Sequence, residues 1–250
     1  MRLLLYNIRY ATGVGKRFHL PVPYSGYLKR TNGNLSQIID FVREVNPDII
    51  GLLEVDSGSY RAEKSNQAEA IASEIKQYLV YQSKYPSDSL ARKVPVVNKQ
   101  GNAILTSQKI ISHRFHYFTE GIKRLVIELE LKDFNIFLVH LSLKFRHRQY
   151  QLQELHRMVK DVNKPVMVAG DFNVFWGDRE LQLFLAATGL RSANGEGQPS
   201  HPSRAPRRQL DYIFHSPEIQ ITDFCIPQVQ LSDHAPLICD FEIHPTVLSK

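Results

Sequence analysis

Polar side chains that can bind cations or move protons stand where several apolar, strand-like runs of this sequence end. These residues are Asn7, Glu54, His140, Asp171, Asn173, Asp211, Asp233 and His234. Carboxylate and amide oxygens are the ligands that hard cations such as Mg²⁺ prefer, and an imidazole beside a carboxylate holds a positive charge. Catalytic side chains commonly lie where a rigid strand meets a loop. The pattern therefore indicates one site assembled from the ends of several strands.

Each of these residues, taken alone, also has an ordinary structural explanation. Asn7 could lie in a bulge, Glu54 could cap a backbone group, His140 could pack in the core, and Asp211 could stand in a turn. The GDFN stretch at residues 170–173 is more specific, although glycine and aspartate after a strand also occur in plain turns. Only the combination and order of the residues favour a functional site.

Apolar periodicity predicts the elements that would position these side chains. Strands are expected at 2–10, 48–54, 101–106, 124–131, 134–143, 165–171, 210–214, 218–224 and 237–243. Helices are expected between Asn34 and Pro47 and at 65–79, 148–162 and 179–187. The segments 11–33 and 191–209 have no apolar period and are expected to be loops. Helices mixed with adjacent strands indicate an α/β fold with mixed sheets and helices outside.

The composition is that of an ordinary globular protein. With 250 residues, 43% hydrophobic and 22% charged, the chain can build a sizeable core, and we expect a single domain over residues 1–250. No apolar run approaches the roughly 20 residues that span a bilayer. Cys225 and Cys239 lie in strand-like segments without metal-binding spacing, so we expect buried free thiols and a reducing, cytoplasmic location. We also expect a monomer.

Seven short motifs occur in an order that resembles a known superfamily. They are LYNI, DIIGLLE, GNAIL, VHLSL, GDFN, LDYIF and SDHAPL, and they span almost the whole chain. In this order they resemble the motifs of the endonuclease/exonuclease/phosphatase superfamily, which includes DNA repair enzymes, DNases, deadenylases, inositol polyphosphate 5-phosphatases and neutral sphingomyelinases. The resemblance implies a four-layer α/β sandwich with two packed mixed β-sheets flanked by helices. It also implies a phosphodiesterase that depends on Mg²⁺ or Mn²⁺ and directs water in line at a phosphodiester.

The resemblance also implies a metal site and a position for the attacking water. Glu54 would be the principal metal carboxylate, with Asn7 and Asp233 contributing directly or through water. Asp171 would orient and deprotonate the attacking water, and Asn173 would hold that water or a phosphate oxygen.

The implied roles of the histidines concern charge on the phosphoryl group. His234, paired with Asp211, would stabilise the phosphoryl oxygens. His140 resembles the second histidine of the DNase and sphingomyelinase branches, where it assists charge stabilisation or departure of the leaving group. The exonuclease III branch has an acidic residue where this chain has Arg9, so a second acidic ligand on the first strand is not expected. These roles suit phosphoryl transfer, which needs positioning and neutralisation of charge.

Cations near the predicted site bear on the substrate. The formal net charge is +6, with pI near 9.2, which favours a polyanionic partner. The candidate substrate-binding residues are Arg9, Arg146, Arg148, Arg207 and Arg208, with Lys144 and Arg204 beside them. The alternative is that these are solvated surface charges. Aromatic and cationic residues also alternate in the loop at 11–33, where Lys16, Arg17, Phe18 and Tyr24 would suit unpaired bases or lipid head groups equally.

Three functions remain open at this point. The first is a nuclease that acts on DNA or RNA, so that nucleic acid is the expected substrate. The second is a phosphodiesterase or phosphatase that acts on a phospholipid or a small phosphorylated metabolite. The third is a non-catalytic nucleic-acid-binding module, which the complete set of acidic residues and histidines disfavours.

Overall fold

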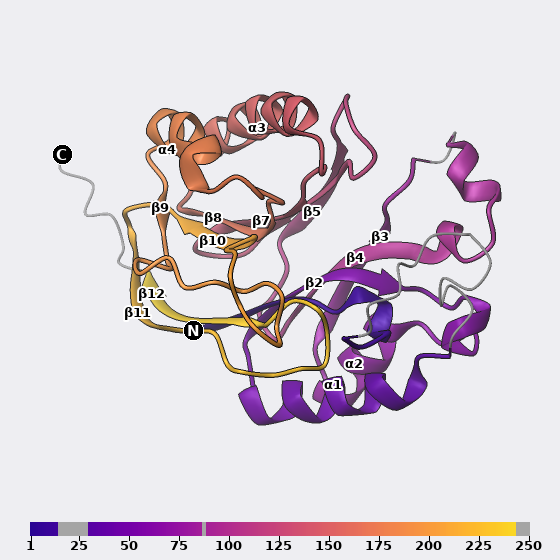
Figure 1. Cartoon of the computed structure of the whole chain (residues 1–250). Coiled ribbons are helices and arrows are strands. Elements are labelled where there is room, and N and C mark those ends of the chain that lie inside the picture. Colours follow the sequence, from indigo (N-terminus) through magenta and orange to yellow (C-terminus); the bar gives the residue numbers. More distant parts are fainter. Residues whose placement is uncertain (15–29, 87–88, 244–250) are drawn as a thin grey trace.

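A computed structural model describes residues 1–14, 30–86 and 89–243 of the chain (Figure 1). Its strands are β1 (Arg2–Asn7), β2 (Ile49–Asp56), β3 (Tyr78–Ser83), β4 (Gln100–Thr106), β5 (Ser112–Tyr117), β6 (Leu125–Glu130), β7 (Asn135–His140), β8 (Val166–Asp171), β9 (Arg191–Ser192), β10 (Asp211–His215), β11 (Ile219–Cys225) and β12 (Leu237–Ile243). Its α-helices are α1 (Asn32–Val45), α2 (Gln67–Ile75), α3 (Phe145–Lys160) and α4 (Gln182–Thr188). Short 3-10 helices are η1 (Arg9–Ala11), η2 (Tyr60–Ala62), η3 (Leu90–Lys93), η4 (Val97–Lys99) and η5 (Asp178–Leu181). The candidate residues Lys16, Arg17, Phe18 and Tyr24 lie outside the described residues.

The strands form two six-stranded sheets that pack face to face. Their orders are β11-β12-β1-β2-β4-β3 and β5-β6-β7-β8-β10-β9. Side chains alternate between the two faces of a strand, so Leu3 and Leu5 of β1 point into the core between the sheets, where they join Ile127 and Leu138 of the second sheet. Both faces of these central strands are covered, which explains their almost unbroken apolar sequences.

Helices cover the outer face of each sheet. Leu4 of β1 packs outward with Ile38 of α1 in one apolar cluster, and Val139 of β7 packs with Leu155 of α3 in another. Figure 1 shows α1 and α2 below the first sheet and α3 and α4 above the second. The layers are therefore helix, sheet, sheet and helix, which confirms the expected four-layer α/β sandwich.

Several predicted boundaries were wrong. The expected first strand to residue 10 ends at Asn7, because Arg9, Tyr10 and Ala11 adopt positive φ and turn the chain. The expected helix at 65–79 ends at Ile75, with left-handed Lys76 beyond it, and Leu79 belongs to β3.

The remaining differences concern weakly patterned segments. Strand β5 was not predicted, and α3 begins at Phe145 rather than at residue 148. The expected loop at 191–209 includes β9. Cys239 is buried as expected, but Cys225 is exposed because β11 is an edge strand.

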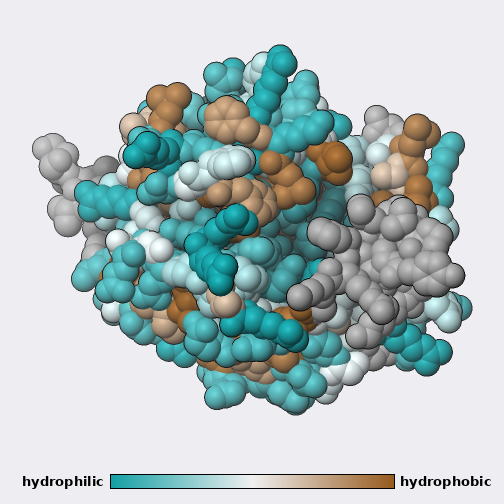
Figure 2. Space-filling model, viewed as in Figure 1, coloured by the Kyte–Doolittle hydropathy of each residue, from teal (hydrophilic) through white to brown (hydrophobic). Residues whose placement is uncertain are grey.

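The pairing of the strands brings the ends that carry polar residues to one edge of the sandwich. In the first sheet β1 and β2 are parallel, so Asn7 and Glu54 come from the same edge. In the second sheet His140 pairs with Asp171 across parallel β7 and β8, and Asp211 pairs with Asp171 across antiparallel β10. Hydrophilic residues cover much of the visible face, with hydrophobic residues between them (Figure 2). No helix in the described part of the chain has the length and apolar character needed to cross a membrane.

Candidate active site

Asp171 lies at the centre of a buried polar cluster formed by both sheets. Its Oδ2 accepts a hydrogen bond from Nδ2 of Asn7 at 3.3 Å and lies 3.1 Å from Nε2 of His140 and 3.9 Å from Nε2 of His234. Its Oδ1 accepts from the backbone N–H of Asn173 at 3.0 Å. Burial alone would raise the pKa of Asp171, but the contact with His140 and the charge of His234 hold it below its usual range. This carboxylate is therefore ionised and has several donors around it.

The backbone around Asp171 is shaped for close packing. Gly170 lies so near β7 that an added Cβ would fall 2.0 Å from the carbonyl oxygen of Val139, which explains why glycine precedes the aspartate. Asn173 adopts φ +52° and donates Nδ2–H to the carbonyl of Leu141 at 2.8 Å. Its amide is thus occupied by the backbone and ties the loop after β8 to the loop after β7. The GDFN stretch is therefore more than a plain turn.

Glu54 reaches the cluster through an irregularity in β2. The register between β2 and β4 shifts between Leu52 and Val55, and Glu54 itself has φ +54°. Its backbone N–H donates to Oδ1 of Asn102 at 3.2 Å. A left-handed conformation costs a residue other than glycine about 1–2 kcal/mol. This strain turns the Glu54 side chain out of the strand alternation and is typical of a functional position.

Cations surround the Glu54 carboxylate. Its Oε1 lies 3.9 Å from Nζ of Lys84, 3.7 Å from Nζ of Lys123 and 4.0 Å from Nε2 of His140. Burial would raise the pKa of Glu54, but the ammonium charges of Lys84 and Lys123, with Lys84 first, lower it to about 2. The positive charge that a metal ion would supply is partly present in the two ammonium groups.

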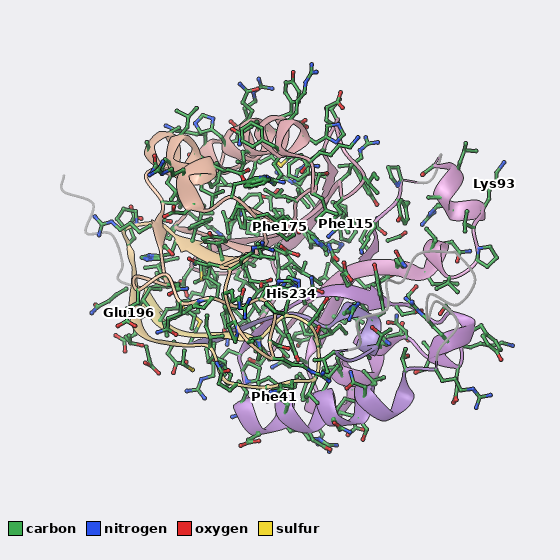
Figure 3. All side chains as sticks on the ribbon, viewed as in Figure 1. Phe41, Lys93, Phe115, Phe175, Glu196 and His234 are labelled. Carbon is green, nitrogen blue, oxygen red and sulfur yellow. The ribbon has the colours of Figure 1, made fainter. Side chains whose placement is uncertain are left out.

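His234 is held by a carboxylate and carries a positive charge. Its Nδ1 lies 2.7 Å from Oδ2 of Asp211, and the same oxygen accepts from the hydroxyl of Ser200 at 2.6 Å. Burial opposes the charge, yet Asp211 and Asp171 raise the pKa of His234 to about 10. In Figure 3 His234 is labelled near the middle of the view, where the two halves of the sandwich meet. Its Nε2 lies on the side of Asp171, 3.9 Å from Oδ2 of that carboxylate.

His140 has the opposite character. It is buried, and burial together with the charge of Lys123 lowers its pKa to about 4, so the ring is neutral at neutral pH. Its Nε2 meets Nζ of Lys123 as well as Asp171. His140 therefore joins the Glu54 side of the cluster to the Asp171 side without adding charge.

Asp233 lies at the edge of the cluster and engages Arg9. Its Oδ2 is 3.3 Å from Nε of Arg9, whose backbone N–H donates to Oδ1 of Asn7 at 3.2 Å. One potential ligand atom from each of His201, Asp233 and His234 lies within 4.8 Å of the others, and Asp171, Asp211 and His234 form a second such group among the described residues. The ring centroids of His201 and His234 are 4.7 Å apart.

The donor set fits a hard divalent cation. Asn7, Glu54, Asp171 and Asp233 offer amide and carboxylate oxygens at the same edge of the sandwich. The contacts do not join the predicted ligands Asn7, Glu54 and Asp233 to one another directly. Asn7 meets Asp171, and Glu54 and Asp171 lie on either side of His140. Asp171 therefore lies between Asn7 and His140, and His140 is the neighbour that it shares with Glu54.

The structure places the predicted substrate-binding arginines in different parts of the molecule. Arg9 joins the cluster, and Arg207 and Arg208 are exposed on the segment before β10, with Arg208 5.7 Å from the ring centroid of Phe175. Arg146, at the start of α3, contacts Tyr150 and not the cluster.

Arg148 is not brought to the site. It is 1% exposed, pairs with Glu180 at 2.6 Å, and donates to the carbonyls of Ser142 and Leu143. A buried guanidinium with these partners holds two loops together and is not exposed to a substrate, contrary to the prediction from the sequence.

Sequence patterns did not identify several residues of the cluster. Lys84 and Lys123 approach from the segments after β3 and before β6, and Lys84 also donates to the hydroxyl of Tyr10. Ser200 and His201 come from the segment expected to be a loop. The position of Lys123 in the sequence could have identified it, because it immediately precedes the strand predicted at 124–131, which is the neighbour of the His140 strand.

The chain is similar to known proteins in sequence and in fold. A UPF0294 protein from Yersinia pseudotuberculosis is 34% identical over 110 residues, which are 43% of this chain and 41% of that protein. The match therefore spans less than half the length of that relative. The human Nocturnin catalytic domain with a bound sulfate has a TM-score of 0.69 at 23% identity, covering 98% of this chain and 93% of that one. A mannosyl-6-phosphatase from Bacteroides thetaiotaomicron has a TM-score of 0.69 at 16% identity, covering 97% and 100%.

These structural likenesses concern the fold alone. The family model described as "Endonuclease/Exonuclease/phosphatase family" matches residues 4–234, which include every residue of the cluster described above. With its sandwich fold and a match over nearly the whole chain, the protein belongs to the endonuclease/exonuclease/phosphatase family.

Proposed function

We propose that this protein is a phosphodiesterase that uses Mg²⁺ or Mn²⁺ bound at the oxygens around Glu54 and Asp171. The observation that carries the proposal is the Asp171 carboxylate, which meets Asn7, His140 and His234 at the junction of the two sheets. When bound, the cation would supply positive charge that stabilises a phosphoryl oxygen. Family membership supports hydrolysis of a phosphate ester as the reaction class.

The chain's own residues would position water and neutralise charge. Asp171 would accept a hydrogen bond from the attacking water and align it with phosphorus. Because the pKa of Asp171 is held below its usual range, this carboxylate is ionised and would orient the water and take its proton as the water attacks. His234, charged through its pairing with Asp211, would donate Nε2–H to a phosphoryl oxygen. Lys123 would add a second donor on the Glu54 side.

Nucleic acid is the first substrate class that we propose. Arg207 and Arg208 are exposed next to β10, and Phe175 beneath Arg208 offers an aromatic face to a base. Fewer arginines support nucleic-acid binding than the sequence indicated, because Arg148 is buried. A phospholipid is the second candidate, favoured by exposed apolar side chains at the same edge of the sandwich. Cytoplasmic location, monomeric state and a single domain stay predictions from the sequence.

The test is hydrolysis of bis-(p-nitrophenyl) phosphate. We expect EDTA to abolish turnover and Mg²⁺ or Mn²⁺ to restore it, and we expect Glu54→Gln to abolish it at any metal concentration. Glu130→Gln is the matched control, because Glu130 pairs with Lys164 at the other end of β6 and should leave turnover unchanged. Full activity in EDTA, or normal metal dependence in Glu54→Gln, would contradict the proposal.

A further inference from the structure

Large apolar side chains are exposed at the edge of the sandwich where the candidate active site lies. They are Ile122 (74% exposed), Leu143 (60%), Phe145 (54%), Trp176 (85%) and Leu183 (78%). We call these five residues the apolar rim. In Figure 2 the upper part of the visible face, around α3 and α4, carries brown side chains between teal ones. Exposed apolar residues that occur singly need no explanation, but several at one edge indicate a binding surface.

The topology explains why residues far apart in sequence share this edge. Ile122 lies between β5 and β6, and β6 runs antiparallel to β7, so its start lies beside the end of β7. Leu143 follows β7 and Trp176 follows β8, and these strands are parallel neighbours. Phe145 and Leu183 line one cavity of about 710 Å³ between α3 and α4.

Buried polar contacts hold the rim in place. Nε2 of Gln151 donates to the carbonyls of Glu120 and Lys123, both at 2.8 Å, and so anchors the segment that carries Ile122. The Arg148–Glu180 pair joins the segment after β7 to η5, which precedes the helix that carries Leu183. The apolar side chains therefore project from loops and helices that are fixed from beneath, and little ordering would be needed on binding.

The rim borders the catalytic cluster and carries positive charge. Leu143 follows His140 by three residues, and Trp176 follows Asn173 by three. Lys144, Arg146 and Arg179 are exposed among the rim residues, against two exposed acids: Asp178, between Trp176 and Arg179, and Glu120, two residues before Ile122. The Arg148–Glu180 pair neutralises itself. The surface thus combines protruding apolar groups with excess cations, which suits an anionic lipid surface.

The chemistry of the rim distinguishes a bilayer from other partners. Three of the five rim residues, Leu143, Leu183 and Ile122, are aliphatic and offer no aromatic face for stacking on bases. The aromatic Phe145 and Trp176 suit the interfacial layer of a bilayer as well as a base, so the rim as a whole favours a bilayer over nucleic acid. A second copy of the chain would bring the same cations together across a twofold contact. We propose that the apolar rim inserts into the head-group layer of an anionic phospholipid bilayer and brings the catalytic cluster over lipid phosphates. The second part of this inference rests on the proposed function, but the docking itself does not.

Trp176 is the single tryptophan of the chain and lies in the rim, so its fluorescence reports on docking directly. The protein would be titrated, with EDTA present, with vesicles of phosphatidylcholine and phosphatidylglycerol, and with pure phosphatidylcholine vesicles for comparison. We expect a blue shift of Trp176 emission and co-sedimentation with the anionic vesicles, both weakened by salt. The double variant Leu143→Ser/Leu183→Ser should weaken partitioning at least about tenfold, because each removed leucine side chain buries several methylene groups. Leu90→Ser is the control: Leu90 is 77% exposed on η3, away from the rim, and should leave partitioning unchanged.

The outcomes separate the inference from its alternatives. No shift with anionic vesicles, or equal weakening by Leu90→Ser, would overturn it. A larger shift with a single-stranded oligonucleotide than with vesicles would assign the rim to nucleic acid. A dimer in sedimentation velocity that the double variant dissociates would assign it to a second copy. Glu54→Gln should bind vesicles as the parent protein does, because Glu54 is not part of the rim. If the parent protein hydrolyses the small phosphodiester but does not bind vesicles, docking is overturned and the proposed function stays intact.

Discussion

In the parent protein the charge on His234 should leave the rate unchanged across the neutral pH range. In Asp211→Asn we expect the rate to fall as the pH rises. The contact with Asp211 raises the pKa of His234 to about 10, so the imidazolium persists through the neutral range. In Asp211→Asn one of the negative charges beside His234 is lost, while burial still lowers its pKa and Asp171 still raises it, so the pKa should fall to about 6.5. At pH 8 only about 3% of His234 would then be charged, which corresponds to a rate about thirtyfold lower than that of the parent protein. At pH 6 about three quarters would be charged and the defect would be less than about twofold.

The assay is kcat/KM for bis-(p-nitrophenyl) phosphate between pH 6 and pH 8.5. His234→Gln should be slow at every pH, and adding Asp211→Asn to it should cost little more, because the carboxylate then has no imidazole to hold. Ser200→Ala keeps the charge of Asp211 and should keep the flat profile. A flat profile for Asp211→Asn, or a double variant as slow as the product of the two single defects, would refute the pairing.

Three further outcomes are expected. Asp171→Asn should lower the rate at least about a hundredfold, the lower end for a positioned acid or base, and a loss of only a few fold would make Asp171 a turn residue. Replacing Arg204, Arg207 and Arg208 with alanine should weaken DNA binding for all sequences and flatten its salt dependence, with little change in turnover of the small substrate. If that turnover falls as much as DNA binding, the arginines serve the reacting phosphate. Arg148→Met should lower the free energy of unfolding by about 3–5 kcal/mol in urea denaturation, because it leaves a buried carboxylate unpaired, and a loss below about 1 kcal/mol would contradict this.

The raised pKa of His234 should also make the free energy of unfolding depend on pH. Its folded pKa lies above its unfolded value, so the stabilisation is fully present below about pH 6.5 and is lost as the pH rises through about 10. Urea denaturation of the parent protein and of His234→Gln at pH 6 and pH 10 measures this difference, which should shrink at the higher pH. A constant difference would show that the pair contributes no charge-dependent stability.

The sandwich could be predicted because its central strands are buried on both faces. Segments such as β2, β7 and β8 read as continuous apolar runs with a polar residue at the end, and that order fixes both the strand and its functional end. The edge strands β3 and β5 are half exposed, and the polar residues in YLVYQS and SHRFHY hide the apolar alternation. Leu79 continued the helical period by coincidence, so the end of α2 could not be recognised from periodicity.

The sequence indicated which acidic residues and histidines belong to the site, but not which residues contact one another there. Acidic residues and histidines at strand ends met because parallel neighbours end together, whereas Lys84 and Ser200 reach the cluster from segments without a pattern. Arg148 could have been placed correctly. On a helix it shares a face with Leu152 and Leu155, which are buried, so its position indicated an inward side chain rather than a substrate contact.

The pairing of β1 with β12 has a consequence for synthesis of the protein. Strand β1 lies inside the first sheet, between β2 and β12, and its register joins Arg2 to Asp240. A growing chain therefore exposes one edge of β1 until nearly all the described residues have left the ribosome, and closure of this long-range contact is expected to be a late folding step. His234 lies three residues before β12, so this closure also brings it to Asp171, which Asn7 of β1 contacts from the other sheet. The polar cluster around Asp171 is therefore complete only when β12 has paired with β1.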